Sequence, residues 1–112
     1  MKRALGVCYY PEHWPEEMWD RDAARMVKVG ITWVHIGEFA WSRIEPTPET
    51  FDFAWLDRAI KILSMAGLKI VLGTPSCTPP RWMIDRFPDI LAVDDAGDPG
   101  KFGSRRHYCF SH

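Results

Sequence analysis

The sequence lacks the features of several protein classes. Its 112 residues contain no apolar run near the roughly 18 residues that a membrane-spanning helix needs. The N-terminus has no long apolar segment, so no signal peptide is predicted. Its three cysteines are widely spaced and odd in number, which argues against a disulfide framework and fits a reduced, cytoplasmic protein. A formal net charge of −1, without a basic patch, predicts no nucleic-acid partner.

Motifs of nucleotide and protease chemistry are also missing. Neither a glycine-rich dinucleotide fingerprint nor a P-loop follows any apolar run. The sequence has no G-x-S-x-G elbow and no H-E-x-x-H pair. These absences weaken the case for a nucleotide-binding open sheet, and they leave a serine protease or metalloprotease without support.

Tryptophan, in contrast, is abundant. Large aromatic rings dominate the packing energy of protein cores, and they can also cover the apolar faces of a sugar ring. We expect about two thirds of the tryptophans to pack in the core and the rest to be available to a ligand. The six tryptophans are Trp14, Trp19, Trp33, Trp41, Trp55 and Trp82.

Three short apolar runs alternate with segments of helical periodicity. They cover residues 4–10, 31–36 and 68–72. Such alternation predicts an α/β fold with a parallel sheet covered on both sides, either a doubly wound open sheet or an eight-stranded barrel. Because a (β/α)8 TIM barrel needs roughly 250 residues, this chain has room for about its first three βα units. A barrel would therefore be incomplete.

Capping residues place the predicted helices. Pro15 begins the first helix and Gly30 ends it; Asp52 is expected to cap the second helix, which Gly67 ends. Thr78 is expected to cap a third, short helix that contains both following prolines. The segment between the second run and the second helix is predicted as a loop, in which Glu45 belongs to an extended turn.

The C-terminal part, from residue 89 on, is predicted to be mostly loop, in which residues 90–93 could form a short strand. No terminating element follows the Arg-Arg-His-Tyr-Cys segment. This abrupt end favours a fragment over a complete small domain.

A carboxylate, Glu38, follows the second apolar run where the sequence changes to glycine and aromatic residues. In barrels of alternating strands and helices, active sites form at the carboxyl ends of the strands. Glu12 and His13 follow the first run and would share that edge with Glu38 in a parallel sheet. Both also have a structural explanation: Glu12 as a turn residue and His13 as a hydrogen-bonded loop histidine. A charge at a strand end is costly unless paired or used, so Glu38 is the strongest functional candidate.

Other polar residues leave alternatives open. Arg105 and Arg106 are either a solvated basic pair or part of a loop that presents a guanidinium to a polar ligand. Cys109 has no partner at metal-ligand spacing, and a zinc site needs about four ligands. Glycoside hydrolysis needs two carboxyl groups around the scissile bond. Glu38 has no convincing second partner, so spacing alone assigns no catalysis.

Five segments together resemble the family 42 glycoside hydrolases, the bacterial β-galactosidases. They occur in the family's order and cover nearly the whole chain. The segments are GVCYYPEHWPEEMWDRD from Gly6, GEFAWSRIEP from Gly37, FDFAWLDRAI from Phe51, GLKIVLGTPSCTPPRW from Gly67 and FGSRRHYC from Phe102.

The resemblance implies that residues 1–112 are the N-terminal part of an incomplete TIM-barrel catalytic domain, with no complete second domain. The parent would be a retaining enzyme that removes terminal β-D-galactose. Both catalytic glutamates would lie beyond His112, so we expect no catalytic residue in this chain and no activity from it alone. Glu38 and Arg105 match family positions that hydrogen-bond galactose hydroxyls.

The family also suggests cofactors and partners. No cofactor is required, but Cys109 matches the first cysteine of a zinc site in some members, so the full-length enzyme could hold a structural zinc. The expected partner is a galactoside, with neither nucleic acid nor membrane, in a cytoplasmic homotrimer. An isolated three-stranded piece of a barrel would leave both sheet edges unpaired, which is an aggregation liability.

Two other functions fit part of the sequence. One is another TIM-barrel glycosidase, of cellulase or mannanase type, because fold alone does not separate such enzymes. The other is a small non-catalytic sugar-binding domain that uses its tryptophans.

Overall fold

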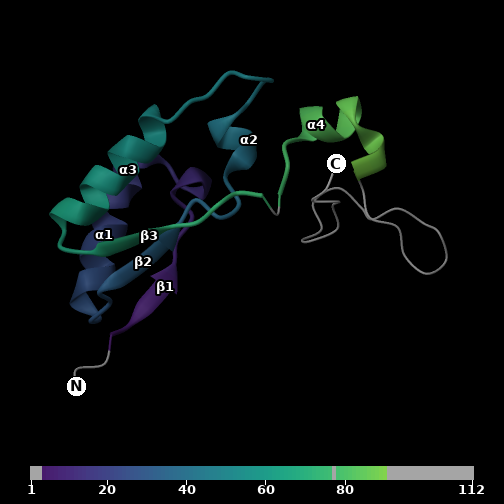
Figure 1. Cartoon of the computed structure of the whole chain (residues 1–112). Coiled ribbons are helices and arrows are strands. Elements are labelled where there is room, and N and C mark those ends of the chain that lie inside the picture. Colours follow the sequence, from purple (N-terminus) through teal and green to yellow (C-terminus); the bar gives the residue numbers. More distant parts are fainter. Residues whose placement is uncertain (1–3, 77, 91–112) are drawn as a thin grey trace. The chain divides into compact units, whose positions relative to one another are not determined.

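The structure is a computed structural model that describes residues 4–76 and 78–90 (Figure 1). The chain divides into two compact units. We call Met1–Gly37 with Phe53–Gly73 the sheet unit, and Glu38–Asp52 with Thr74–His112 the second unit. The elements in chain order are β1 (Gly6–Cys8), η1 (Pro11–His13), η2 (Glu16–Met18), α1 (Trp19–Lys28), β2 (Trp33–Ile36), α2 (Trp41–Ile44), α3 (Ala54–Met65), β3 (Lys69–Leu72), α4 (Arg81–Arg86) and η3 (Pro88–Ile90), where η marks a 3₁₀ helix.

The sheet unit contains a three-stranded parallel sheet in the order β1-β2-β3. In its register Val7 lies beside Val34, and Val34 lies beside Ile70. The three strands run in the same direction in Figure 1. The predicted parallel α/β arrangement is therefore confirmed for the described residues, and the carboxyl ends of the three strands lie at one edge.

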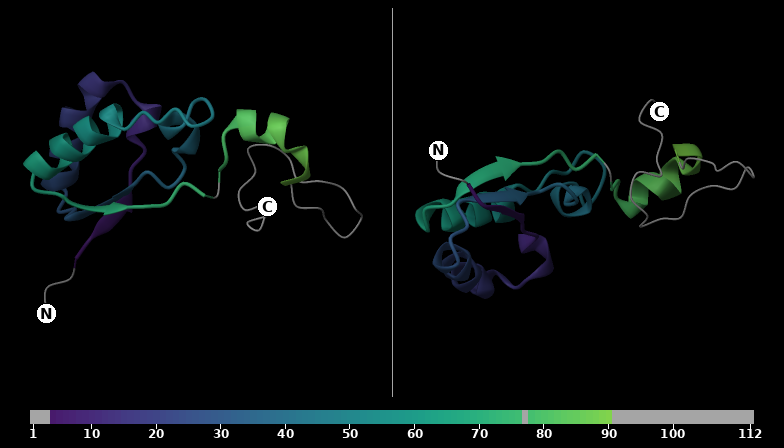
Figure 2. Two further views of the ribbon diagram at one scale, coloured as in Figure 1. Left: turned by 45° about the horizontal axis from the view of Figure 1, so that its top comes forward. Right: turned by 90° about the horizontal axis from the view of Figure 1, so that it is seen from below.

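The two faces of this sheet differ. Helices α1 and α3 contact each other and cover one face of the sheet (Figures 1 and 2). Val34 and Ile36 are two residues apart in β2, so they lie on the same face of the sheet. Both side chains are almost completely buried. Trp33 and Val71, on the opposite face, are 38% and 45% exposed. Among the described residues the helices cover one face, not both as the sequence suggested.

The helices pack through the stripes that their periodicity predicts. Trp19, Ala23 and Met26 of α1 are buried at offsets of four and seven residues. The same periodicity also predicts Val27 on this face, which is wrong: Val27 is 44% exposed and lies outside the buried stripe. The buried residues of α3 are Trp55, Leu56, Ala59 and Leu63.

Four predicted details of the helices are wrong. Pro15 does not begin α1: it is the N-cap of η2, and α1 starts at Trp19. The expected loop after β2 contains the short helix α2, which four residues are too few to reveal by periodicity. Asp52 does not cap α3: Phe53 is the N-cap, without a side-chain cap bond. Helix α4 starts at Arg81, after both prolines, because the residue before a proline is disfavoured in helical conformation.

The strands and the C-terminal part also differ in extent. Strand β1 has three residues, fewer than the predicted run over 4–10. Ile90 belongs to η3, so it does not begin a strand, and the rest of the segment 90–93 lies outside the described residues. None of the described helices has the length and apolar character needed to cross a bilayer.

Gly37 ends β2 in a conformation that favours glycine. Its φ angle is +84°, and an added Cβ would lie 3.1 Å from Leu72 Cδ1. Gly30, after α1, has a φ angle of +91° but no atom within 4 Å of an added Cβ. Alanine substitutions at these two glycines can therefore distinguish the cost of the left-handed backbone from the cost of crowding.

Gly37→Ala is expected to lower the free energy of unfolding by about 2–3 kcal/mol, since crowding adds to the left-handed backbone cost. Gly30→Ala, the matched control, should lose only the backbone part, about 1–2 kcal/mol. Urea unfolding of both variants measures the difference. Equal losses would show that the contact with Leu72 is unimportant.

Candidate functional site

Glu38 lies where the sequence predicted it, at the carboxyl end of a parallel strand. It comes two residues after Ile36, the last residue of β2, and it begins the second unit. Its side chain is half-buried. The turn that contains Glu38 leads through Ala40, the N-cap of α2. The position at a strand end is thus confirmed, whereas the role of the carboxylate in sugar binding stays a prediction.

The second unit holds a buried carboxylate that the sequence did not single out. Glu45 follows α2 and is 9% exposed. Its Oε1 accepts a hydrogen bond from Trp41 Nε1, and its Oε2 accepts one from the backbone N–H of Glu49, both at 2.9 Å. The carbonyl oxygen of Glu45 accepts a third, also at 2.9 Å, from Trp82 Nε1. We call Trp41, Glu45, Glu49 and Trp82 the Glu45 cluster.

This cluster fixes two of the six tryptophans. Both indole N–H groups donate to Glu45, so the hydrogen-bonding edges of Trp41 and Trp82 are already used. A half-buried ring held in this way can offer a ligand its carbon surface at little entropic cost. The sequence placed Glu45 in an extended turn and did not predict its bonds to the two tryptophans, because one donor lies 37 residues further along the chain.

A polar pair in the sheet unit involves the segment after β1. The Tyr9 hydroxyl donates a 2.6 Å hydrogen bond to Asp22 Oδ2 of α1. Burial raises the pKa of Tyr9 well above its ordinary value, and the bond to Asp22 with the nearby negative charge raises this pKa further. The pair ties the chain after β1 to the first helix.

The Tyr9 pair predicts a pH dependence. A raised pKa means that the folded protein favours the neutral phenol, so this contribution is complete below about pH 10 and is lost as the pH rises toward the folded-state pKa. The urea midpoint should therefore fall more steeply above about pH 10 in the wild type than in Tyr9→Phe. Urea titrations at two alkaline pH values check this, and equal slopes would contradict it.

Glu12 and His13 are the last two residues of η1, which Tyr10 separates from Tyr9. The ring of His13 lies 5.4 Å from that of Tyr10, and its side chain is exposed. Both residues belong to the sheet unit and Glu38 to the second unit. Their grouping in one cleft therefore stays a prediction.

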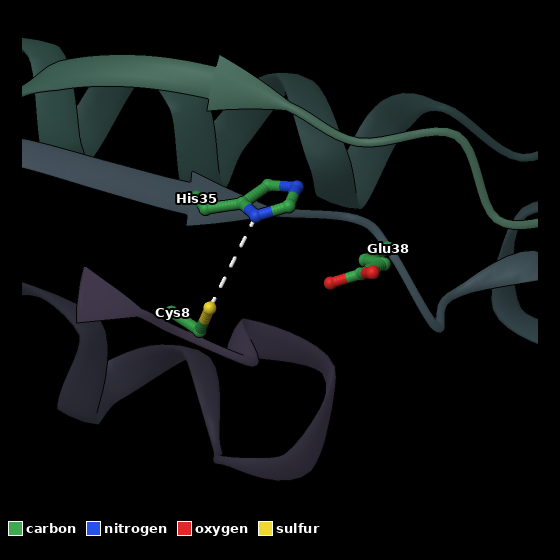
Figure 3. A group of neighbouring side chains, drawn as sticks. All are labelled: Cys8, His35 and Glu38. Atoms are coloured by element: carbon green, nitrogen blue, oxygen red, sulfur yellow. Dashed lines mark hydrogen bonds between the residues drawn. The ribbon is translucent and has the colours of Figure 1, made fainter. Parts of the chain in front are cut away.

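Cys8 and His35 lie side by side on the face of the sheet opposite α1 and α3 (Figure 3). The Cys8 Sγ is 4.0 Å from His35 Nδ1. Trp33 lies on the same face, with Lys69 Nζ 5.3 Å from its ring centroid. A thiol and an imidazole supply two of the about four ligands of a zinc site, so this pair in the sheet unit is not a complete metal centre. Figure 3 also labels Glu38, where the chain continues beyond β2.

Two predicted site residues, Arg105 and Cys109, lie outside the described residues. The galactose-binding role of Arg105 and the zinc-ligand role of Cys109 are therefore untested by this structure.

Sequence comparison finds related proteins over nearly the whole chain. The profile of the Glyco_hydro_42 family, described as "Beta-galactosidase", matches residues 8–112. A β-galactosidase of Thermus thermophilus is 59% identical over 107 residues, which cover 96% of this chain. The β-galactosidase BgaH of Haloferax lucentense is 50% identical over the same length. The chain spans only 17% and 16% of the lengths of these relatives.

Solved structures agree with this relationship. The β-galactosidase of the psychrophilic Marinomonas ef1 matches 98% of this chain with a TM-score of 0.90 and 55% identity. The enzyme of the haloarchaeon Halorubrum lacusprofundi matches the same share with a TM-score of 0.90 and 49% identity. This chain covers 17% and 16% of those chains.

Proposed function

We propose that this chain, which belongs to the Glyco_hydro_42 family of β-galactosidases, is the N-terminal segment of a retaining enzyme. This enzyme would hydrolyse terminal β-D-galactose residues. The observation that carries the proposal is the match itself, at 59% identity over 96% of the chain to a curated β-galactosidase. The position of Glu38 at the carboxyl end of a parallel strand supports it, because glycosidase barrels build their sites at that edge.

The fold proposed for the parent is a (β/α)8 TIM barrel, of which residues 1–112 form part. Three features support it: the parallel order β1-β2-β3, the helices on a single face, and an opposite face that exposes Trp33 and Val71. In a barrel the inner face of each strand is filled by side chains of the other strands. The exposed face would then be the inward one.

Within this segment we assign substrate binding to Glu38 and Arg105, and catalysis to no residue. Glu38 would accept hydrogen bonds from galactose hydroxyls, while Arg105 would donate them. The two catalytic glutamates belong to the part of the parent outside this chain. Cys109 would ligate a structural zinc only with cysteines from that part, and the homotrimer is likewise proposed for the parent.

An activity assay tests the proposal. The complete reading frame that contains this sequence should be expressed and assayed on chromogenic β-galactoside, β-glucoside and β-mannoside. We expect the galactoside to be preferred, and no turnover by residues 1–112 alone. A preference for the glucoside or mannoside would favour a cellulase- or mannanase-type enzyme instead. Galactose binding without any hydrolysis by the complete protein would favour a non-catalytic sugar-binding domain.

A further inference from the structure

Glu45 is a buried carboxylate with a defined set of partners. Burying a charge is costly unless hydrogen bonds satisfy it. Both carboxylate oxygens of Glu45 accept such bonds, from Trp41 Nε1 and from the backbone N–H of Glu49, each at 2.9 Å. A carboxylate suits this place because both neighbours are donors. A glutamine would present one oxygen and one NH2 group, and the NH2 group would face an N–H donor.

The backbone of Glu45 adds two further bonds. Its N–H donates to the carbonyl oxygen of Trp41 at 2.7 Å, and its own carbonyl oxygen accepts from Trp82 Nε1 of α4. Glu49 has a φ angle of +62°, a strained conformation for a residue other than glycine. Glu45 thus connects α2, the turn around Glu49 and α4, all within the second unit.

This cluster is close in sequence to Glu38. Trp41 follows Glu38 by three residues, and the carbonyl oxygen of Ala40 accepts hydrogen bonds from the N–H groups of Arg43 and Ile44. The turn that carries Glu38 therefore continues directly into a helix whose first side chain is held by Glu45. Four residues are too few for a helix that is stable by itself, so α2 depends on such contacts.

We propose that Glu45 is a positioning residue for galactose binding: it does not contact the sugar but fixes α2 and, through it, the placement of Glu38. The proposal rests on the proposed function. It differs from a purely structural role because it predicts energetic coupling between Glu45 and Glu38. A residue that only stabilised the fold would change the amount of folded enzyme, not the affinity of each folded molecule for sugar.

Glu45→Gln in the complete enzyme is the first test. We expect kcat/KM for a chromogenic β-galactoside to fall about tenfold and the inhibition constant of galactose to rise about tenfold, since a small misplacement of a binding group has effects of this order or larger. The inhibition constant does not depend on the fraction of active enzyme. Glu17→Gln is the matched control: Glu17 is an exposed carboxylate on η2, outside the Glu45 cluster, and a change below about twofold is expected.

A double-mutant cycle is the second test. In a Glu38→Gln background, Glu45→Gln should change kcat/KM and the galactose inhibition constant by less than about twofold, because the group that it positions is already altered. Trp41→Phe removes the same hydrogen bond from the other side and keeps a ring. It should reproduce the effect of Glu45→Gln, so the test does not depend on the folding of one variant.

Two outcomes would overturn this proposal: an unchanged galactose inhibition constant in both Glu45→Gln and Trp41→Phe, or full additivity with Glu38→Gln. Both are distinct from failure of the proposed function, which would appear as a wild-type protein without β-galactosidase activity.

Discussion

Replacing Glu38 by glutamine in the complete enzyme is expected to lower kcat/KM for a β-galactoside by about two to three orders of magnitude. A hydrogen bond to a charged group contributes about 1.5–3 kcal/mol, and a carboxylate at this edge of the sheet can accept two from sugar hydroxyls. Each 1.36 kcal/mol lost from transition-state stabilisation slows the reaction about tenfold. Steady-state kinetics with a chromogenic galactoside measure the change.

Glu17→Gln provides the control for Glu38→Gln. Glu17 has the same chemistry but is exposed on η2 of the sheet unit, so its replacement should change kcat/KM less than about twofold. Circular dichroism of both variants confirms that they are folded. A loss below about threefold for a folded Glu38→Gln enzyme would show that Glu38 does not bind the sugar.

Trp19→Ala is expected to lower the free energy of unfolding by about 3–5 kcal/mol, the usual cost of deleting a buried tryptophan side chain. Trp19 is 1% exposed at the start of α1, and its Nε1 donates a 3.0 Å hydrogen bond to the carbonyl oxygen of Pro11. Typical domains have a stability of about 5–15 kcal/mol. The variant should therefore unfold at a much lower urea concentration, as measured by far-ultraviolet circular dichroism.

Trp14→Ala is the matched control for Trp19→Ala. Trp14 is 50% exposed, so its replacement should cost about 1 kcal/mol or less. Similar losses for the two variants would mean that the packing of α1 on the sheet does not depend on Trp19.

Local periodicity explains what the sequence could predict about the fold. The parallel α/β order and the buried stripes of α1 and α3 follow from apolar residues at regular offsets, which each segment displays by itself. The end of β2 was recognisable from the glycine that follows it, which is why Glu38 could be placed at a strand end.

Features that depend on distant residues were not predictable. Burial of Glu45 requires donors from α2 and from α4, far apart in sequence. The tryptophans show the same limit: Trp19 and Trp55 are fully buried, Trp41 and Trp82 half-buried, and Trp14 and Trp33 exposed. We expected about two thirds to pack in the core, but composition does not reveal on which face of a strand or helix a ring lies.

The division into two units suggests how this segment of the family can diversify. Both stretches of the second unit start directly after a strand, the first after Gly37 and the second after Gly73. The strands and the helices α1 and α3 belong to the other unit. Insertions or deletions beyond either glycine are therefore expected to leave the register of the strands unchanged, so this part of the chain can vary in length while the scaffold stays intact.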